Sequence, residues 1–198
     1  MTTKDVILYT DYKSPYAYLA NEAAYALEQD FDVRLDWRPY TLNIPSYLGA
    51  VDSRDPHQWR RVRYSYMDCR RMANERGLTV AGPKKIFDSS LAHIGMLYAQ
   101  RAEVFRAYND TVFERFWRRE LDIEDPEVII SVLNEVGADT GEFKDFVAGE
   151  GRLEHDRIRS EAEENGVFGV PMFVVDDELF WGGDRIPILR RRLEALGR

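Results

Sequence analysis

The chain has 198 residues, of which 44% are hydrophobic and 13% aromatic, and its formal net charge at pH 7 is −8. This length and apolar content allow a sizeable core in one domain, with or without an insertion. The negative charge argues against broad binding of nucleic-acid phosphates, and no apolar run approaches the roughly 18 residues that a membrane span requires.

The sequence also bears on the cellular compartment. The first five residues lead directly into an apolar strand pattern, with neither a long apolar segment nor a cleavage site of small residues. Cys69 is the single cysteine, so no internal disulfide can form. We therefore expect a cytoplasmic protein without nucleic-acid or membrane partners.

The beginning of the chain predicts a β-α-β unit. Residues 6–9 form an apolar strand pattern, and residues 33–37 alternate between apolar and polar side chains, which is the period of a half-buried strand. Between them, apolar residues at helical spacing predict a helix over 15–29, which Ser14 and Pro15 open.

Residues 42–150 show helix signals but no convincing strand pattern. Asp125 and Pro126 supply an N-cap and a first-turn proline, and Gly137 ends the helix that follows them. Further helices are predicted over 64–76, 90–100 and 103–119. We interpret this stretch as an all-helical insertion.

The end of the chain returns to strand patterns. A helix over 152–165 precedes two strands, which are joined by a tight turn at Asp176 and Asp177. The last helix is expected to begin with Asp184 as its N-cap and Pro187 in its first turn. The two strands are expected over 172–175 and 179–181.

Strand patterns near both ends of the chain indicate an α/β protein with one mixed sheet, whose faces the helices can cover. The predicted order is β-α-β, a helical insertion, and then α-β-β-α. We expect one domain of residues 1–40 and 151–198 around the sheet, and an inserted helical domain of residues 41–150.

Arginines occur in runs along the predicted helices. Acidic residues lie close to these runs, which is typical of solvated helix faces rather than of nucleic-acid contacts. The runs are Arg60-Arg61, Arg70-Arg71, Arg118-Arg119 and Arg190-Arg191-Arg192.

Two short motifs far apart in the sequence carry the functional signal. Ser14-Pro15 follows the first strand and opens a helix, and Val170-Pro171 opens a strand near the other end. Together they have the layout of a thioredoxin-fold active site. A disulfide enzyme would place Cys-x-x-Cys where residues 14–17 read Ser-Pro-Tyr-Ala, so exchange between paired protein thiols is excluded.

Three segments extend this likeness to a known group of proteins. They are residues 11–20, 166–171 and 180–185, which read DYKSPYAYLA, GVFGVP and FWGGDR. These segments resemble the 2-hydroxychromene-2-carboxylate isomerases and the kappa-class glutathione transferases, in the DsbA-like branch of the thioredoxin superfamily. The resemblance covers nearly the whole chain and implies a thioredoxin-like fold that carries an inserted helical domain.

The resemblance implies a site for glutathione or another low-molecular-weight thiol. In the family, the serine that matches Ser14 lies at a helix N-terminus and donates a hydrogen bond to the sulfur. A helix N-terminus favours a thiolate through its unpaired N–H groups and its partial positive charge. Lys13 is expected to stabilise the thiolate further.

The other cofactor contacts follow from the same resemblance. A cis peptide before Pro171 is expected to leave the backbone of Val170 free to pair with the tripeptide as an added strand. Gly183 and Asp184 are expected to hold the γ-glutamyl end, with the Asp184 carboxylate paired to its ammonium group. Arg61 falls near a lysine that reaches glutathione in the family, and it is expected to pair with a carboxylate.

The resemblance therefore implies a glutathione-dependent isomerase of an aromatic carboxylate. The thiolate would add to the conjugated substrate, permit rotation about the former double bond and leave again. The substrate pocket is expected to include Tyr12, Lys13, Tyr16 and Trp181. A homodimer is compatible with the family.

Two alternatives remain open. One is conjugation of glutathione to an electrophile, as in a kappa-class transferase. The other is a thioredoxin-fold module that binds an extended peptide along Val170 without a catalytic thiol. No metal site is expected, because His57, His93 and His155 are widely separated in the sequence.

Overall fold

The computed structural model describes residues 3–197 and contains one mixed sheet built from both ends of the chain. The strand order is β2-β1-β3-β4, in which β1 pairs parallel with β2 and antiparallel with β3, and β3 pairs antiparallel with β4. This confirms the predicted α/β fold with a mixed sheet. The strands are β1 Lys4–Thr10, β2 Val33–Pro39, β3 Met172–Val175 and β4 Glu178–Trp181.

The register of the sheet places apolar side chains together in the core. Val6 on β1 lies opposite Leu35 on β2, and Leu8 lies opposite Phe173 on β3. All four side chains are buried, as the strand alternation predicts. The turn between β3 and β4 was predicted correctly, since Asp176 and Asp177 take the left-handed backbone conformation of a two-residue hairpin loop.

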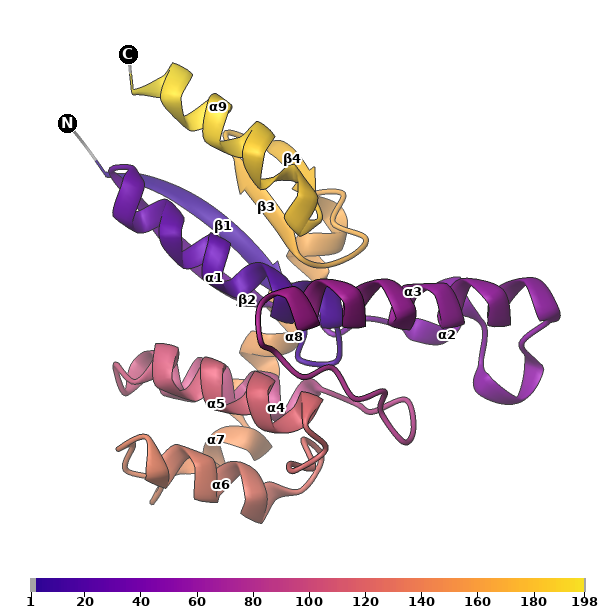
Figure 1. Ribbon diagram of the computed structural model, residues 1–198. Helices are drawn as coiled ribbons and strands as arrows, with labels where there is room; N and C mark the ends of the chain where they lie inside the picture. Colours follow the sequence, from indigo (N-terminus) through magenta and orange to yellow (C-terminus); the bar gives the residue numbers. More distant parts are fainter. Residues whose placement is uncertain (1–2, 198) are drawn as a thin grey trace.

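Two helices from opposite ends of the sequence cover the sheet. Figure 1 shows α1 (Pro15–Asp30) and α9 (Ile186–Leu196) running alongside the strands, and the two helices contact each other. Apolar residues such as Ala24 and Leu27 on α1 and Leu189 on α9 are fully buried. These contacts hold the N-terminal end of α1 at a fixed position at the end of β1.

The middle of the chain forms a group of helices below the sheet in Figure 1. Its central helix, α4, contacts every other member of the group. Gly95 permits this packing, because a Cβ atom at that position would lie 2.2 Å from the Tyr108 hydroxyl on α5. The group consists of α4 Ser90–Arg101, α5 Phe105–Trp117, α6 Pro126–Glu135, α7 Phe143–Ala148 and α8 Glu150–Glu164.

Helix α8 joins the two parts of the fold, because it contacts α4 and α7 and also β2. The proposed division at residues 41 and 151 stays a prediction. None of the helices in residues 3–197 has the length and apolar content needed to cross a bilayer.

The longest helix, α3 (Pro56–Glu75), begins earlier than the sequence pattern indicated. A capping box starts it: Asp55 accepts a hydrogen bond from the Gln58 backbone at 2.8 Å, and the Gln58 side chain accepts one from the Asp55 backbone at 2.9 Å. In Figure 1 the first half of α3 projects beyond the other elements, near α2 (Ile44–Leu48) and the short 3-10 turn Val51–Ser53. The sequence prediction contained neither α2 nor α7.

The start of the final helix differs from the prediction. Arg185, not Asp184, is the N-cap of α9, and a 3-10 turn Gly183–Arg185 precedes it. The Asp184 carboxylate instead accepts a hydrogen bond from the Arg185 guanidinium at 2.8 Å. The prediction that Asp184 caps this helix was therefore wrong, because the 3-10 turn moves the N-cap by one residue, from Asp184 to Arg185.

Candidate active site

A large cleft of about 1310 Å³ opens where α1 begins. Its walls are formed by the start of α1 and by helix α3, together with residues 82–87 and 168–170. The cleft brings together six of the residues predicted for the site from distant parts of the sequence. These are Lys13, Ser14, Tyr16, Arg61, Val170 and Trp181.

Ser14 both caps α1 and lines the cleft. It is the N-cap of α1, and its Oγ accepts a hydrogen bond from the Ala17 backbone N–H at 3.2 Å. Accepting that bond leaves the hydroxyl hydrogen of Ser14 free to donate to a ligand. Pro15 has no N–H, and the N–H of Tyr16 has no acceptor among the residues described. The cleft thus receives one hydroxyl and one backbone donor at a helix N-terminus.

Lys13 and Asp11 form a buried ion pair behind Ser14. The Lys13 Nζ lies 3.5 Å from Asp11 Oδ2, and the two side chains are 7% and 0% exposed. Asp11 also accepts hydrogen bonds from the backbone N–H groups of Lys13 at 3.1 Å and Leu42 at 2.8 Å. Burial alone would raise the pKa of Asp11, but the Lys13 ammonium and His93 outweigh it and lower this pKa to about 2.

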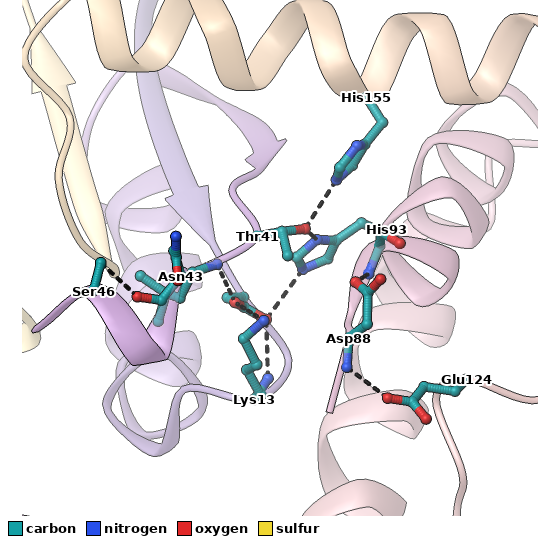
Figure 2. A network of polar contacts seen from close by, with 11 residues as sticks. Lys13, Thr41, Asn43, Ser46, Asp88, His93, Glu124 and His155 are labelled. Atoms are coloured by element: carbon teal, nitrogen blue, oxygen red, sulfur yellow. Dashed lines mark hydrogen bonds and ion pairs between the residues drawn. The ribbon is translucent and has the colours of Figure 1, made fainter. Parts of the chain in front are cut away.

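A line of polar side chains continues from this pair into the helical group. Figure 2 shows His93 on α4, Thr41 after β2 and His155 on α8 in a row that leads away from Lys13. The Thr41 Oγ1 lies 2.8 Å from His93 Nδ1 and 2.9 Å from His155 Nε2. Burial and the neighbouring His93 lower the pKa of His155 to about 4. The sequence analysis missed this arrangement, because only tertiary packing brings the two histidines together.

Val170 offers its backbone to the cleft. The Val170–Pro171 peptide is cis, as predicted, and neither the N–H nor the C=O of Val170 has a backbone partner in residues 3–197. Next to it, the rings of Phe168 and Trp181 meet edge to face with centroids 4.9 Å apart. The two side chains are 59% and 54% exposed, so they present an apolar surface beside the free backbone groups.

Basic side chains dominate the opposite wall, and half of them come from α3. No Asp or Glu is found among the described residues that line the cleft, although the chain has a net charge of −8. The cationic wall, as we call it, consists of Arg54, Arg60, Arg61, Arg63, Arg70, Lys84, Lys85 and Arg119. Four of its arginines donate to backbone carbonyls: Arg54 to Leu48 and Gly49, Arg63 to Trp59, Arg70 to Val80, and Arg119 to Gly82.

The cationic wall adds to one interpretation of the sequence. The arginine runs were expected to be solvated helix faces, and Arg60, Arg61, Arg70 and Arg119 are exposed as expected, but they also line the cleft. In a cleft without carboxylates, such side chains favour an anionic ligand. Arg60, Arg61 and Arg70 lie on α3 together with Trp59 and Tyr66, which also line the cleft.

Tyr16 on α1 and Cys69 on α3 are neighbours beside the cleft. Tyr16 lines it and donates a hydrogen bond to Asp68 Oδ2 at 3.4 Å. Burial raises the pKa of Tyr16 to about 12, so its ring stays a neutral surface. Cys69 is completely buried, and burial raises the pKa of its thiol to about 11. Cys69 is therefore poorly suited to replace the absent redox cysteines.

The remaining predicted residues lie elsewhere. Tyr12 does not line the cleft: it is fully buried, with its ring centroid 4.8 Å from that of Phe113 and 5.4 Å from that of His93. The chain turns sharply after β1, which directs Tyr12 into the core, so its expected contact with substrate is corrected to a supporting role.

Gly183 and Asp184 also lie outside the group of cleft-lining residues. They form part of the 3-10 turn that packs against α1, where Gly183 faces Ala20. Pro171 is buried directly behind Val170. The expected contacts of these three residues with a thiol cofactor stay predictions.

Comparisons with known proteins agree with this geometry. Residues 5–194 match the family model of the DSBA-like thioredoxin domain. The chain is 29% identical over 197 residues to a 2-hydroxychromene-2-carboxylate isomerase of Sphingobium xenophagum, covering 96% of this chain and 98% of that protein. It is 28% identical to a protein of the same name from Pseudomonas putida, covering 98% and 94% of the two chains.

A solved structure of a 2-hydroxychromene-2-carboxylate isomerase superposes with a TM-score of 0.81 at 26% sequence identity, covering 98% of this chain and 96% of the other. The resemblance noted from the three sequence segments is thus confirmed over nearly the full length.

Proposed function

Because the chain belongs to the DsbA-like thioredoxin domain family, we propose that it is a thiol-dependent isomerase of an aromatic carboxylate, with glutathione as the thiol. One observation carries the proposal: the cleft places the free hydroxyl hydrogen of Ser14 opposite a cationic wall without carboxylates. The relatives named 2-hydroxychromene-2-carboxylate isomerase support a substrate of that type.

The residues present fit a thiol tripeptide. The Ser14 hydroxyl and the Tyr16 N–H supply two donors for a sulfur at the start of α1. The unpaired backbone of Val170 can accept a peptide as an added strand. Glutathione carries two carboxylates, and Arg61, which lines the cleft, would pair with one of them.

When bound, the thiol supplies a nucleophilic sulfur that adds to a conjugated substrate, frees the former double bond to rotate and then departs. Ser14 and Lys13 would stabilise negative charge on that sulfur through a hydroxyl bond and a buried ammonium. The aromatic ring of the substrate would pack against Trp181 and Phe168. The cationic wall would hold its carboxylate and so fix the orientation of the substrate.

A non-enzymatic function has one observation in its favour. The free backbone of Val170 lies beside the exposed rings of Phe168 and Trp181, which suits an extended peptide with apolar side chains. Such a module would bind peptides that free glutathione does not displace. Competition between a labelled peptide and glutathione therefore separates the two functions.

The direct test of the isomerase is turnover of 2-hydroxychromene-2-carboxylate, followed by ultraviolet absorbance with and without reduced glutathione. We expect turnover that requires the thiol and that Ser14→Ala strongly reduces. A product that retains the thiol as a thioether would indicate conjugation instead. Turnover unaffected by removing the thiol would contradict the proposal.

A further inference from the structure

Two arginines of the cationic wall are held against the same short segment of chain. Arg70, on α3, donates from its Nε to the Val80 carbonyl at 3.2 Å. Arg119, which follows α5, donates from its Nε to the Gly82 carbonyl at 2.7 Å. Side chains from two different elements thus meet at residues 80–82, and both of them line the cleft.

This segment is itself fixed between the helices. Val80 is buried, and the Ala81 N–H donates to the carbonyl of Trp117, the last residue of α5, at 2.8 Å. The Nε bonds of Arg70 and Arg119 therefore end on a packed part of the backbone. This restricts both guanidinium groups before a ligand binds and so lowers the entropy that binding would lose.

Gly82 brings the two guanidinium groups near each other. Its carbonyl accepts the Arg119 hydrogen bond, and a Cβ atom on Gly82 would lie 3.4 Å from the Arg70 Nη2. The Arg70 guanidinium also lies over the Tyr66 ring, with 5.9 Å between its Cζ and the ring centroid. Two positive groups beside one residue repel each other, and an anion bound between them would offset that repulsion.

Neither guanidinium group has a carboxylate partner in residues 3–197. Each uses its Nε on a backbone carbonyl, and the Nη atoms of both have no hydrogen-bond partner in this part of the chain. Their neighbours in the two arginine runs differ. Arg71 and Arg118 each pair with an acidic residue one turn earlier, at 3.3 and 2.6 Å, and neither lines the cleft. Each run therefore places one arginine beside an acid and the other in the cleft.

Acidic residues approach Arg119 only from outside the cleft. Arg119 also lines a smaller hollow of about 250 Å³, together with Glu120 and Asp122. Neither acid lines the cleft, and Arg70 does not line the hollow. The cleft is therefore the place where one anion can contact both guanidinium groups.

We propose that Arg70 and Arg119 form a two-arginine clamp for the carboxylate of the substrate, and that this clamp selects anionic over neutral aromatic compounds. A planar guanidinium group matches the two oxygens of a carboxylate, and Nη atoms without partners can donate to both. The inference rests on the proposed function and narrows it, because it assigns the substrate carboxylate to two of the eight basic side chains of the wall.

A pair of ligands tests the clamp without thiol or turnover. 2-Naphthoate carries a carboxylate, and 2-naphthamide is a neutral compound of nearly the same shape. We expect the parent protein to bind the carboxylate at least about tenfold more tightly than the amide, and Arg70→Gln/Arg119→Gln to reduce this preference to less than about threefold. Calorimetric titration measures both ligands. Equal binding of the two ligands by the parent protein would overturn the inference.

The neighbouring arginines provide a matched control. Arg71→Gln/Arg118→Gln removes the same charge from the adjacent positions outside the cleft, so we expect it to keep the preference of the parent protein. Circular dichroism checks that both double variants fold. If the two double variants lose the preference equally, or if both keep it, the clamp does not select the carboxylate and the inference is wrong.

Glutathione separates this inference from the proposed function. We expect Arg70→Gln/Arg119→Gln to bind glutathione as the parent protein does, because Arg61 and not the clamp is assigned to the tripeptide. Weakened glutathione binding with unchanged naphthoate binding would assign the clamp to the thiol and overturn the inference. Failure of the parent protein to bind glutathione would refute the proposed thiol site, and the comparison of naphthoate with its amide would still decide the clamp.

Discussion

Two parts of the cleft hold positive charge in different ways. One is its floor, which we define as Lys13 with Asp11 behind it, and the other is the cationic wall. On the floor, Lys13 is buried and fixed against Asp11. Figure 2 shows His93, Thr41 and His155 in a row that leads away from Lys13. On the wall, Arg61 and three further arginines come from α3, the other basic side chains come from residues 54, 84, 85 and 119, and no carboxylate is found among the described cleft residues. The floor therefore holds one ammonium group in a fixed position, whereas the exposed side chains of the wall can change conformation around a bound anion.

The largest expected effect on stability comes from removing the Asp11 carboxylate that pairs with Lys13. Asp11→Asn would leave the Lys13 ammonium buried without its partner, so we expect a loss of about 3–5 kcal/mol in the free energy of unfolding. Asp5→Asn on β1 is the control, since the Asp5–Arg34 pair is exposed and should contribute less than about 1 kcal/mol. Urea unfolding compares the two, and equal losses would contradict the distinction.

The pH dependence of stability follows from the same carboxylate. The pKa of Asp11 is lowered from 3.8 to about 2 by folding, so its contribution is complete above the unfolded value and is lost as pH falls from about 4 to 2. A shift of this size corresponds to about 2–3 kcal/mol. Unfolding measured across this pH range should show the loss in the parent protein. Asp11→Asn should flatten this part of the curve, and an unchanged slope would be evidence against a buried ionised Asp11.

Ser14 lies between the floor and the ligand, so its effect on function should be next in size. We expect Ser14→Ala to reduce turnover by about 10- to 100-fold, because a hydrogen bond to a charged sulfur contributes about 1.5–3 kcal/mol. The same change removes a helix cap and should cost about 1 kcal/mol in stability.

Ser14→Asp separates these two effects, since Asp also caps helices but places a negative charge beside the sulfur. It should retain stability and lose activity in kinetic and thermal unfolding measurements. Full activity in Ser14→Asp would be incompatible with a thiolate at this position.

The cationic wall should give the smallest single-residue effect, because its members can substitute for one another. We expect Arg61→Gln to raise the KM for a carboxylate substrate by about 2- to 10-fold with little change in kcat. Arg157→Gln is the control, because Arg157 pairs with Glu161 on the exposed side of α8 and does not line the cleft. Steady-state kinetics at two salt concentrations measures both, and equal responses would mean that the wall does not bind substrate.

Local signals in the sequence predicted much of the fold. The strand patterns at both ends gave one mixed sheet, and Ser14-Pro15 and Asp125-Pro126 each marked a helix start that the structure confirms. Asp55-Pro56 is the same kind of signal and marks the true start of α3, which the apolar spacing alone placed too late.

The site was harder to predict where it depends on tertiary packing. Ser14 and Val170 could be paired because both motifs occur in a known family, and the cleft indeed brings them together. The contacts among Asp11, His93 and His155 have no signature in sequence spacing, since each residue comes from a different element. Tyr12 was misplaced because the direction of a side chain after a strand end depends on the turn that follows.

The central claim is that this cleft binds a thiol tripeptide, and calorimetric titration with reduced glutathione tests it most directly. Parent protein, Ser14→Ala and Arg61→Gln would be titrated at neutral pH and again above the pKa of the free thiol. We predict saturable binding that both variants weaken. The absence of binding at millimolar glutathione, or equal binding in all three proteins, would contradict the account.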